Sequence, residues 1–376
     1  MLKNIYVIIS FSVFKPKSPF LDPTQANKSL CFYQFFLLIF FRYKPTPMAS
    51  TIEIENKSKE IETEILPYIR VYKDGTVERL MESPIVPPSL QNPETGVSSK
   101  DIVISDHPSI SARLYLPNSV QSNPKKLPIL LYFHGGGFFM ESAFSFLDHR
   151  FLNLLVSEAK VVAVSVEYRL APEHPLPAAF HDSWEALNWV TSHSNSSDTN
   201  TEPWLHDHAD FKRIYIGGDS AGASIANYLA LRAGVETLKG NANIAGAFLS
   251  HPFFWGSTPV GSEPNEGASH LHARIWKLVY PSAAGGIDEP TMNPLGPGAP
   301  SLATLACSKL LVCVAGKDAL RDRGLWYYDA VKNSGWEGEV KLFEVPDQDH
   351  VFHIYNTDTT AAKQMIARLA SFLVSI

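Results

Sequence analysis

The sequence predicts an α/β fold with a mostly parallel central sheet and helices on both faces. From about residue 100 onward, strand-like and helix-like segments alternate without a long interruption, as parallel strands joined by crossover helices require. The β-branched run 161–166, followed by a helical pattern around 183–190, is one example. The length of 376 residues suits one large domain, and no internal repeat is visible.

One strand-to-helix junction carries the motif Gly-x-Ser-x-Gly at 218–222. A β-branched and aromatic run at 212–217 precedes the motif, and the apolar run 223–231 that follows it is typical of a helix. In this setting a sharp turn holds a serine hydroxyl out of the backbone, as in a nucleophile elbow. The motif alone recurs by chance, but its flanks make Ser220 a candidate nucleophile.

A second strand end, after the buried run 128–133, carries His134 and three glycines. Glycines there can direct backbone N–H groups into a cleft because no Cβ atom obstructs them. Such groups stabilise an oxyanion together with the N–H of the residue after the nucleophile. A flexible loop is the alternative interpretation, and we expect His134 to brace the loop rather than transfer protons. The predicted oxyanion donors are the N–H groups of Gly135, Gly136, Gly137 and Ala221.

The acid of such a site is expected to follow the nucleophile along the chain. The run 309–315 reads as a strand, and Asp318 is the first acidic residue beyond it. Catalytic loops lie at this end of the strands in a parallel sheet. Asp322, one helical turn later, is the competitor, although an acid there also suits the first turn of a helix. We favour Asp318.

The base is expected after the next strand-like run, 339–345. His350 lies in the loop that follows, and His353 comes three residues later, near the start of a closing helix. We favour His350. The chain has 13 histidines, but neither 206–208 nor the pair at 270 and 272 shows metal-ligand spacing. We therefore expect no metal and no organic cofactor.

Six stretches together resemble the hormone-sensitive-lipase branch of the α/β-hydrolases, and within it the plant carboxylesterases. This group also includes 2-hydroxyisoflavanone dehydratases, tuliposide-converting enzymes and gibberellin receptors. The resemblance covers roughly residues 48–376. The stretches are IRVYKDG at 69–75, SARLYLP at 111–117, HGGGF at 134–138, EYRLAPEH at 167–174, GDSAG at 218–222 and DHVFH at 349–353.

The resemblance implies an α/β-hydrolase fold and a serine carboxylesterase that hydrolyses small carboxylic esters. It implies that Ser220, Asp318 and His350 form the catalytic triad. The gibberellin receptors lack the triad histidine, so His350 argues against a pure receptor. The dehydratases of the group tend to carry threonine at the position of Ser220, so serine favours an esterase. A lyase acting on a plant secondary metabolite and a hormone-receptor-like binding protein remain the alternatives.

The first 47 residues differ from the rest of the chain. They hold six Lys and Arg against one acid, Asp22, and two apolar runs at 5–9 and 35–41. Both runs are shorter than the roughly 18 residues of a membrane span. We expect translation to begin at Met48, the extension 1–47 to lie outside the fold, and no stable membrane span.

The composition limits which partners and which cell compartment we expect for the protein. A net charge of −6 gives no reason to expect nucleic acid as a partner. Three cysteines, at 31, 307 and 313, suggest a reducing compartment, so we expect the cytoplasm, with the extension leaving targeting open.

Two segments, 50–90 and the Gly-, Pro- and Ser-rich 255–302, are candidates for a lid over the acyl pocket. Phe138, Phe139 and Phe144 fit either that pocket or the core.

Overall fold

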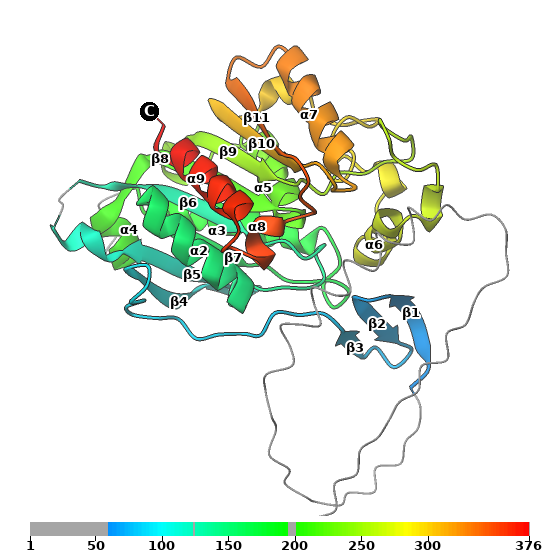
Figure 1. Cartoon of the computed structure of the whole chain (residues 1–376), viewed down its shortest axis with the longest axis horizontal. Helices are drawn as coiled ribbons and strands as arrows, with labels where there is room; N and C mark the ends of the chain where they lie inside the picture. Colours follow the sequence, from blue (N-terminus) through cyan, green and yellow to red (C-terminus); the bar gives the residue numbers. More distant parts are fainter. Residues whose placement is uncertain (1–58, 123–124, 195–200, 376) are drawn as a thin grey trace, which may run out of the picture. The chain divides into compact units, whose positions relative to one another are not determined.

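A computed structural model of the chain describes residues 59–122, 125–194 and 201–375. The expected extension 1–47 lies outside these ranges, as do residues 50–58 of the first candidate lid segment. Among the described residues, eight strands form one sheet in the order β11-β10-β9-β8-β6-β7-β5-β4 (Figure 1). Their bounds are β4 Val97–Asp106, β5 Ser109–Pro117, β6 Leu127–Phe133, β7 Val162–Glu167, β8 Ala209–Asp219, β9 Ile244–Ser250, β10 Lys309–Ala315 and β11 Glu339–Val345.

Strands β6 to β11 run parallel, and β4 and β5 form an antiparallel pair at one edge of the sheet. Strand β6 is buried at all of its positions except Leu127, because strands covered on both faces carry continuous apolar runs. Leu131 of β6 is in register with Val164 of β7 and with Ile216 of β8. The carboxyl ends of these strands therefore meet at one edge, where the candidate site residues follow them.

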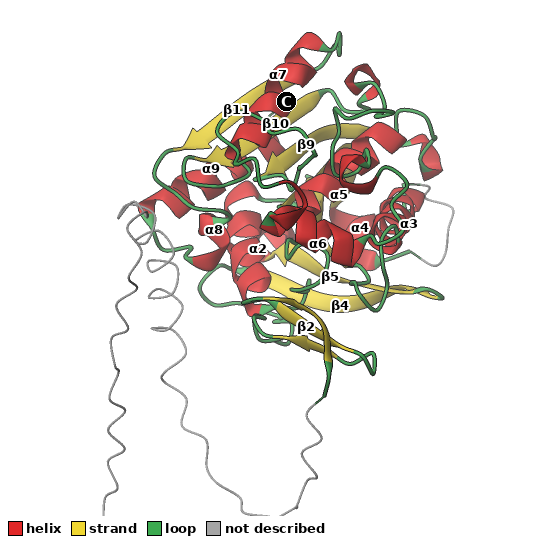
Figure 2. Ribbon diagram, turned by 90° about the vertical axis from the view of Figure 1, so that its right-hand side faces the viewer, coloured by secondary structure: helices red, strands yellow, loops and turns green. Residues whose placement is uncertain are grey.

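Helices cover both faces of the sheet, as predicted (Figure 2). Alternate side chains of β6 enter two different cores: Leu130 and Tyr132 pack with α2 and α9, whereas Ile129 and Leu131 pack with α3 and α5. This alternation confirms the predicted layered α/β architecture. The helices are α2 Phe146–Ala159, α3 Ala178–Ser192, α4 Pro203–His208, α5 Ala221–Arg232, α6 Leu271–Val279, α7 Arg321–Asn333, α8 Phe352–Tyr355 and α9 Thr360–Val374.

A separate three-stranded antiparallel sheet precedes the main one. It consists of β1 Ile61–Ile65, β2 Ile69–Tyr72 and β3 Val77–Arg79. Helix α6 packs against β1, and Arg274 Nη2 of the helix donates to the carbonyl oxygen of Glu64 at 2.7 Å. Parts of the two candidate lid segments therefore contact each other, while their action as a lid stays a prediction. None of the helices within the described ranges has the length and apolar character to cross a bilayer.

Candidate active site

Ser220 lies in the turn between β8 and α5. Its backbone has φ 51° and ψ −114°, a left-handed conformation that L-residues rarely adopt. Its N–H donates to the carbonyl oxygen of Ser250 at 2.8 Å, which holds the turn against β9. A Cβ atom at Gly222 would overlap the carbonyl oxygen of Phe133, so the glycine of the motif permits the close approach of α5 to β6.

Three side chains from three strand ends meet at this turn. His350 Nε2 lies 2.9 Å from Ser220 Oγ, and His350 Nδ1 lies 2.7 Å from Asp318 Oδ2. Asp318 Oδ1 also accepts a hydrogen bond from the Leu320 N–H at 2.9 Å, which fixes the carboxylate in its loop. The structure thus brings together the three residues that the sequence singles out, although 130 residues separate Ser220 from His350.

The electrostatics of the pair suit an imidazole that accepts a proton. Burial opposes the charged form of His350, but the charge of Asp318 and its hydrogen bond outweigh burial and raise the pKa of His350 above 6.5. Burial also disfavours the Asp318 carboxylate, yet His350 lowers the pKa of Asp318 to about 2. The His350 side chain is 30% exposed, so the imidazole is reachable from solvent.

The two competing residues point elsewhere. Asp322 Oδ2 accepts hydrogen bonds from the N–H and the hydroxyl of Ser262, and Oδ1 pairs with Arg321. His353 is fully buried, and neither of its ring nitrogens has a hydrogen-bond partner among the described residues. Burial holds the pKa of His353 well below 6.5, so this imidazole is neutral.

The glycine loop after β6 adopts a series of left-handed conformations. The φ angles are +93° at Gly136, +60° at Gly137 and +68° at Phe138. The hydroxyl of Tyr168 donates to the carbonyl oxygen of His134 at 2.7 Å, and the two rings stack with centroids 4.2 Å apart. His134 is fully buried and is part of the loop's support, as expected.

Asp219, beside Ser220, supports the same loop. The hydroxyl of Tyr132 donates to Asp219 Oδ1 at 2.5 Å, and the other carboxylate oxygen lies against Gly135. Burial raises the pKa of Asp219 to about 6, against the lowering effect of Tyr132, of the His350 charge and of a hydrogen bond with the Gly135 backbone. Asp219 therefore ties the first glycine of the loop to the turn that carries Ser220.

His251 is a neighbour of the site that sequence reasoning missed. It follows β9, its Nδ1 lies 3.0 Å from Ser250 Oγ, and its ring centroid lies 5.8 Å from that of His350. Burial lowers the pKa of His251 to about 3, so a neutral, buried imidazole lies next to the partly exposed imidazole of His350. Its position directly after a central strand is a signal that could have identified it.

Aromatic and imidazole rings from the segment between β9 and α6, and from the start of α6, contact one another near Ser220. The Phe253 N–H donates to the Ser220 carbonyl oxygen at 3.1 Å, and the Phe253 ring lies 5.5 Å from His272. The His272 ring lies 4.9 Å from His270, which stacks on Trp255 at 4.2 Å. In the part of the chain described, no group of three or more His, Cys, Asp or Glu is arranged to hold a metal ion.

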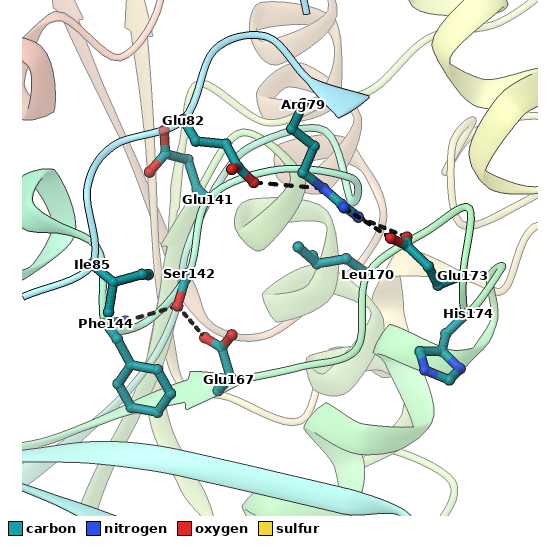
Figure 3. A pocket seen from close by; sticks show the side chains of 10 residues that line it. All are labelled: Arg79, Glu82, Ile85, Glu141, Ser142, Phe144, Glu167, Leu170, Glu173 and His174. Carbon is teal, nitrogen blue, oxygen red and sulfur yellow. Dashed lines mark hydrogen bonds and ion pairs between the residues drawn. The ribbon is translucent and has the colours of Figure 1, made fainter. Parts of the chain in front are cut away.

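A cavity of about 540 Å³ lies beside the segment that follows the glycine loop (Figure 3). None of the residues that line it is Ser220, Asp318 or His350. Phe144 lines this cavity, whereas Phe138 and Phe139 are fully buried in the core. The lining residues are Arg79, Glu82, Ile85, Glu141, Ser142, Phe144, Glu167, Leu170, Glu173 and His174.

Comparisons with known proteins agree with this geometry. A family model described as an alpha/beta hydrolase fold matches residues 130–354. The chain is 59% identical over 320 residues to a 2-hydroxyisoflavanone dehydratase of Glycyrrhiza echinata, covering 84% of this chain and 97% of that protein. It is 43% identical over 323 residues to probable carboxylesterase 2 of Arabidopsis thaliana, covering 85% and 98%. The crystal structure of esterase LipW from Mycobacterium marinum matches with a TM-score of 0.59 and 26% identity, covering 74% and 82%.

Proposed function

The chain belongs to the α/β-hydrolase family, in the branch of the plant carboxylesterases, and we propose that it is a serine carboxylesterase acting on small carboxylic esters. One observation carries the proposal: the hydrogen-bonded series from Ser220 Oγ through His350 to Asp318, with distances of 2.9 and 2.7 Å. A nucleophile, a base and a group that orients the base are the three parts that acyl transfer needs.

The proposed reaction has two steps. His350 Nε2 removes the proton of the Ser220 hydroxyl, and the oxygen attacks the carbonyl carbon of the ester. Asp318 fixes the tautomer of the imidazole and stabilises its cation, which the raised pKa of His350 reflects. The imidazolium then protonates the leaving alcohol, and water, activated by the same base, releases the acid from the acyl-enzyme.

The negative oxygen of the tetrahedral intermediate requires donors. We assign this role to the N–H groups of Gly136, Gly137 and Ala221, each next to the nucleophile in the chain or on the loop after β6. The sequence places Gly135 among these donors as well, but its backbone is hydrogen-bonded to Asp219, so we propose that Gly135 anchors the loop instead. Loss of one such donor costs about 2.7–4 kcal/mol in the barrier.

The second candidate is a lyase that eliminates water from a plant metabolite. The observation that favours it is the 59% identity to a protein named 2-hydroxyisoflavanone dehydratase. In this reaction His350 would remove a proton from carbon, and Ser220 would have a secondary role. The presence of both His350 and Ser220 favours the esterase over the lyase, because only the esterase reaction uses Ser220 Oγ to form a bond, the one to the acyl carbon.

Ser220→Ala separates the two. For an esterase, turnover of a short aryl ester by the variant falls by at least about 10³-fold, because no acyl-enzyme can form. A lyase retains much of its activity in the same variant. Labelling by a fluorophosphonate, present in the wild type and absent in the variant, reports the nucleophile independently. Pure, folded wild-type protein without any ester turnover would contradict the proposal.

A further inference from the structure

Arg79, at the end of β3, contacts the glycine loop through its guanidinium group. Nε donates to the carbonyl oxygen of Phe139 at 2.6 Å, and Nη2 donates to that of Ala171 at 3.1 Å. The two terminal nitrogens bind both carboxylate oxygens of Glu173, at 2.8 and 2.7 Å. Figure 3 shows this fork between Arg79 and Glu173, with Glu82 on the other side at 3.6 Å.

The two carbonyl groups belong to segments that are already joined to the loop. The N–H of Phe139 donates to the Gly136 carbonyl oxygen at 3.1 Å, and the N–H of Ala171 donates to that of Phe138 at 2.9 Å. Arg79 therefore binds residues 136–139 in two ways, directly at Phe139 and through Ala171, which is hydrogen-bonded to Phe138. Its donors reach from the N-terminal sheet, 60 residues away from Phe139 in the sequence.

The burial and the planar geometry of the Arg79 guanidinium favour a rigid contact with the two carbonyl groups. The Arg79 side chain is only 16% exposed, so the carbonyl groups that it binds would lose their partner if it were removed. A bidentate pair with Glu173 fixes the plane of the guanidinium and aims Nε at Phe139. A lysine ammonium is a point charge and cannot reproduce this planar fork.

We propose that Arg79 is a positioning residue for the oxyanion loop: by binding the carbonyl groups of Phe139 and Ala171, it sets the direction of the Gly136 and Gly137 N–H groups. The proposal rests on the proposed esterase function. It makes the N-terminal sheet part of the machinery, because the loop reaches its working geometry only when β3 is docked against it.

The test compares Arg79→Ala and Arg79→Lys with the wild type on a short aryl ester. Rates are expressed per active site, counted by fluorophosphonate titration, so unfolded protein does not enter the result. We expect kcat to fall about 10- to 100-fold in both variants, because a displacement of about 1 Å in positioned groups has such an effect. We expect KM to change little. A trifluoromethyl ketone, which forms an oxyanion on the serine, should lose affinity in parallel with kcat, and millimolar guanidinium should restore part of the rate of Arg79→Ala.

Arg213 offers a matched control at the opposite end of the strands. Its Nε binds Asp210 at 2.7 Å and its Nη2 donates to the Lys126 carbonyl oxygen at 2.8 Å, where β6 and β8 begin. Arg213→Lys removes a guanidinium that likewise binds a carboxylate and a backbone carbonyl oxygen, without touching the loop, and should keep the wild-type kcat. If Arg79→Lys keeps the wild-type kcat and inhibitor affinity, or if Arg213→Lys loses as much, the inference is wrong. A wild type that shows no ester turnover would overturn the proposed function and this inference with it.

Discussion

The hydrogen bond between Tyr132 and Asp219 allows a controlled test of the electrostatics beneath the site. Tyr132 is fully buried, and its hydroxyl donates to Asp219 Oδ1 at 2.5 Å. Tyr327 is also fully buried, and its hydroxyl donates to Asn227 Oδ1 at the same distance. The two tyrosines differ in the charge of the acceptor, so Tyr132→Phe and Tyr327→Phe form a matched pair.

The expected cost follows from that charge. A hydrogen bond to an ionised group contributes about 1.5–3 kcal/mol to the free energy of unfolding, whereas a neutral one contributes about 0.5–1.5 kcal/mol. The pKa of Asp219 is raised by burial to about 6, so the carboxylate is ionised at pH 8 and mostly protonated at pH 5. Tyr132→Phe should therefore cost about 1.5–3 kcal/mol at pH 8 and about 0.5–1.5 kcal/mol at pH 5.

The sign agrees with proton linkage. The Tyr132 hydroxyl lowers the pKa of Asp219 in the folded protein, so its removal raises that pKa further above the unfolded value. The folded variant then retains its proton to a higher pH than the folded wild type. Stability falls with rising pH wherever the folded state binds more protons, so the deficit of the variant grows as the pH rises through about 6.

Urea denaturation at pH 5 and pH 8 measures these differences through the midpoint and the slope. Tyr327→Phe should show a cost that does not depend on pH in this range, because its acceptor does not titrate. Equal costs for the two variants at pH 8, or a cost for Tyr132→Phe that is the same at both pH values, would show that the charge of Asp219 does not set the strength of this hydrogen bond.

Two further predictions concern the imidazoles. Asp318→Asn should lower kcat roughly 10⁴-fold, and it should move the acid limb of the pH–rate profile downward from its wild-type place above pH 6.5, because Asp318 raises the pKa of His350. Asp322→Asn, its control, should keep kcat within about twofold, and comparable losses in both would reject the assignment. His353→Phe should make the melting temperature fall less between pH 7 and pH 5. Burial keeps the folded His353 neutral, so unfolding of the wild type takes up a proton below pH 6.5. The wild type therefore loses stability as the pH falls, by up to about 1.36 kcal/mol per pH unit. An unchanged pH dependence of melting would contradict this.

The sequence predicts well what short-range patterns encode. The runs 309–315 and 339–345 coincide with β10 and β11, because each is a β-rich run bounded by turn residues. The turn at Ser220 is likewise encoded in five consecutive residues and their flanks. Asp318 and His350 follow from one rule, that catalytic loops lie at the carboxyl ends of parallel strands.

What the sequence does not reveal depends on contacts between distant segments. Helix α6 lies within 255–302, which the sequence indicates only as a candidate lid segment, because the Gly, Pro and Ser around it obscure a helix of nine residues. Arg79 stands in an ordinary charged stretch, and its partners Phe139 and Glu173 lie 60 and 94 residues away. The sequence does not reveal whether Phe138 and Phe139 line the pocket or fill the core, since aromatic residues after a glycine loop suit both places. Both side chains are buried in the core.

Helix α6 and the strands β1 to β3 flank the glycine loop without belonging to the eight-stranded sheet. Their contact at Arg274 and Glu64 joins segments 210 residues apart. Mutations in these two segments can reshape the approach to the nucleophile while the strand ends keep the reacting atoms in place. Substitutions in these segments that leave Arg79 and its bonds to Phe139 and Ala171 in place are therefore expected to alter substrate selectivity more than the chemistry at Ser220.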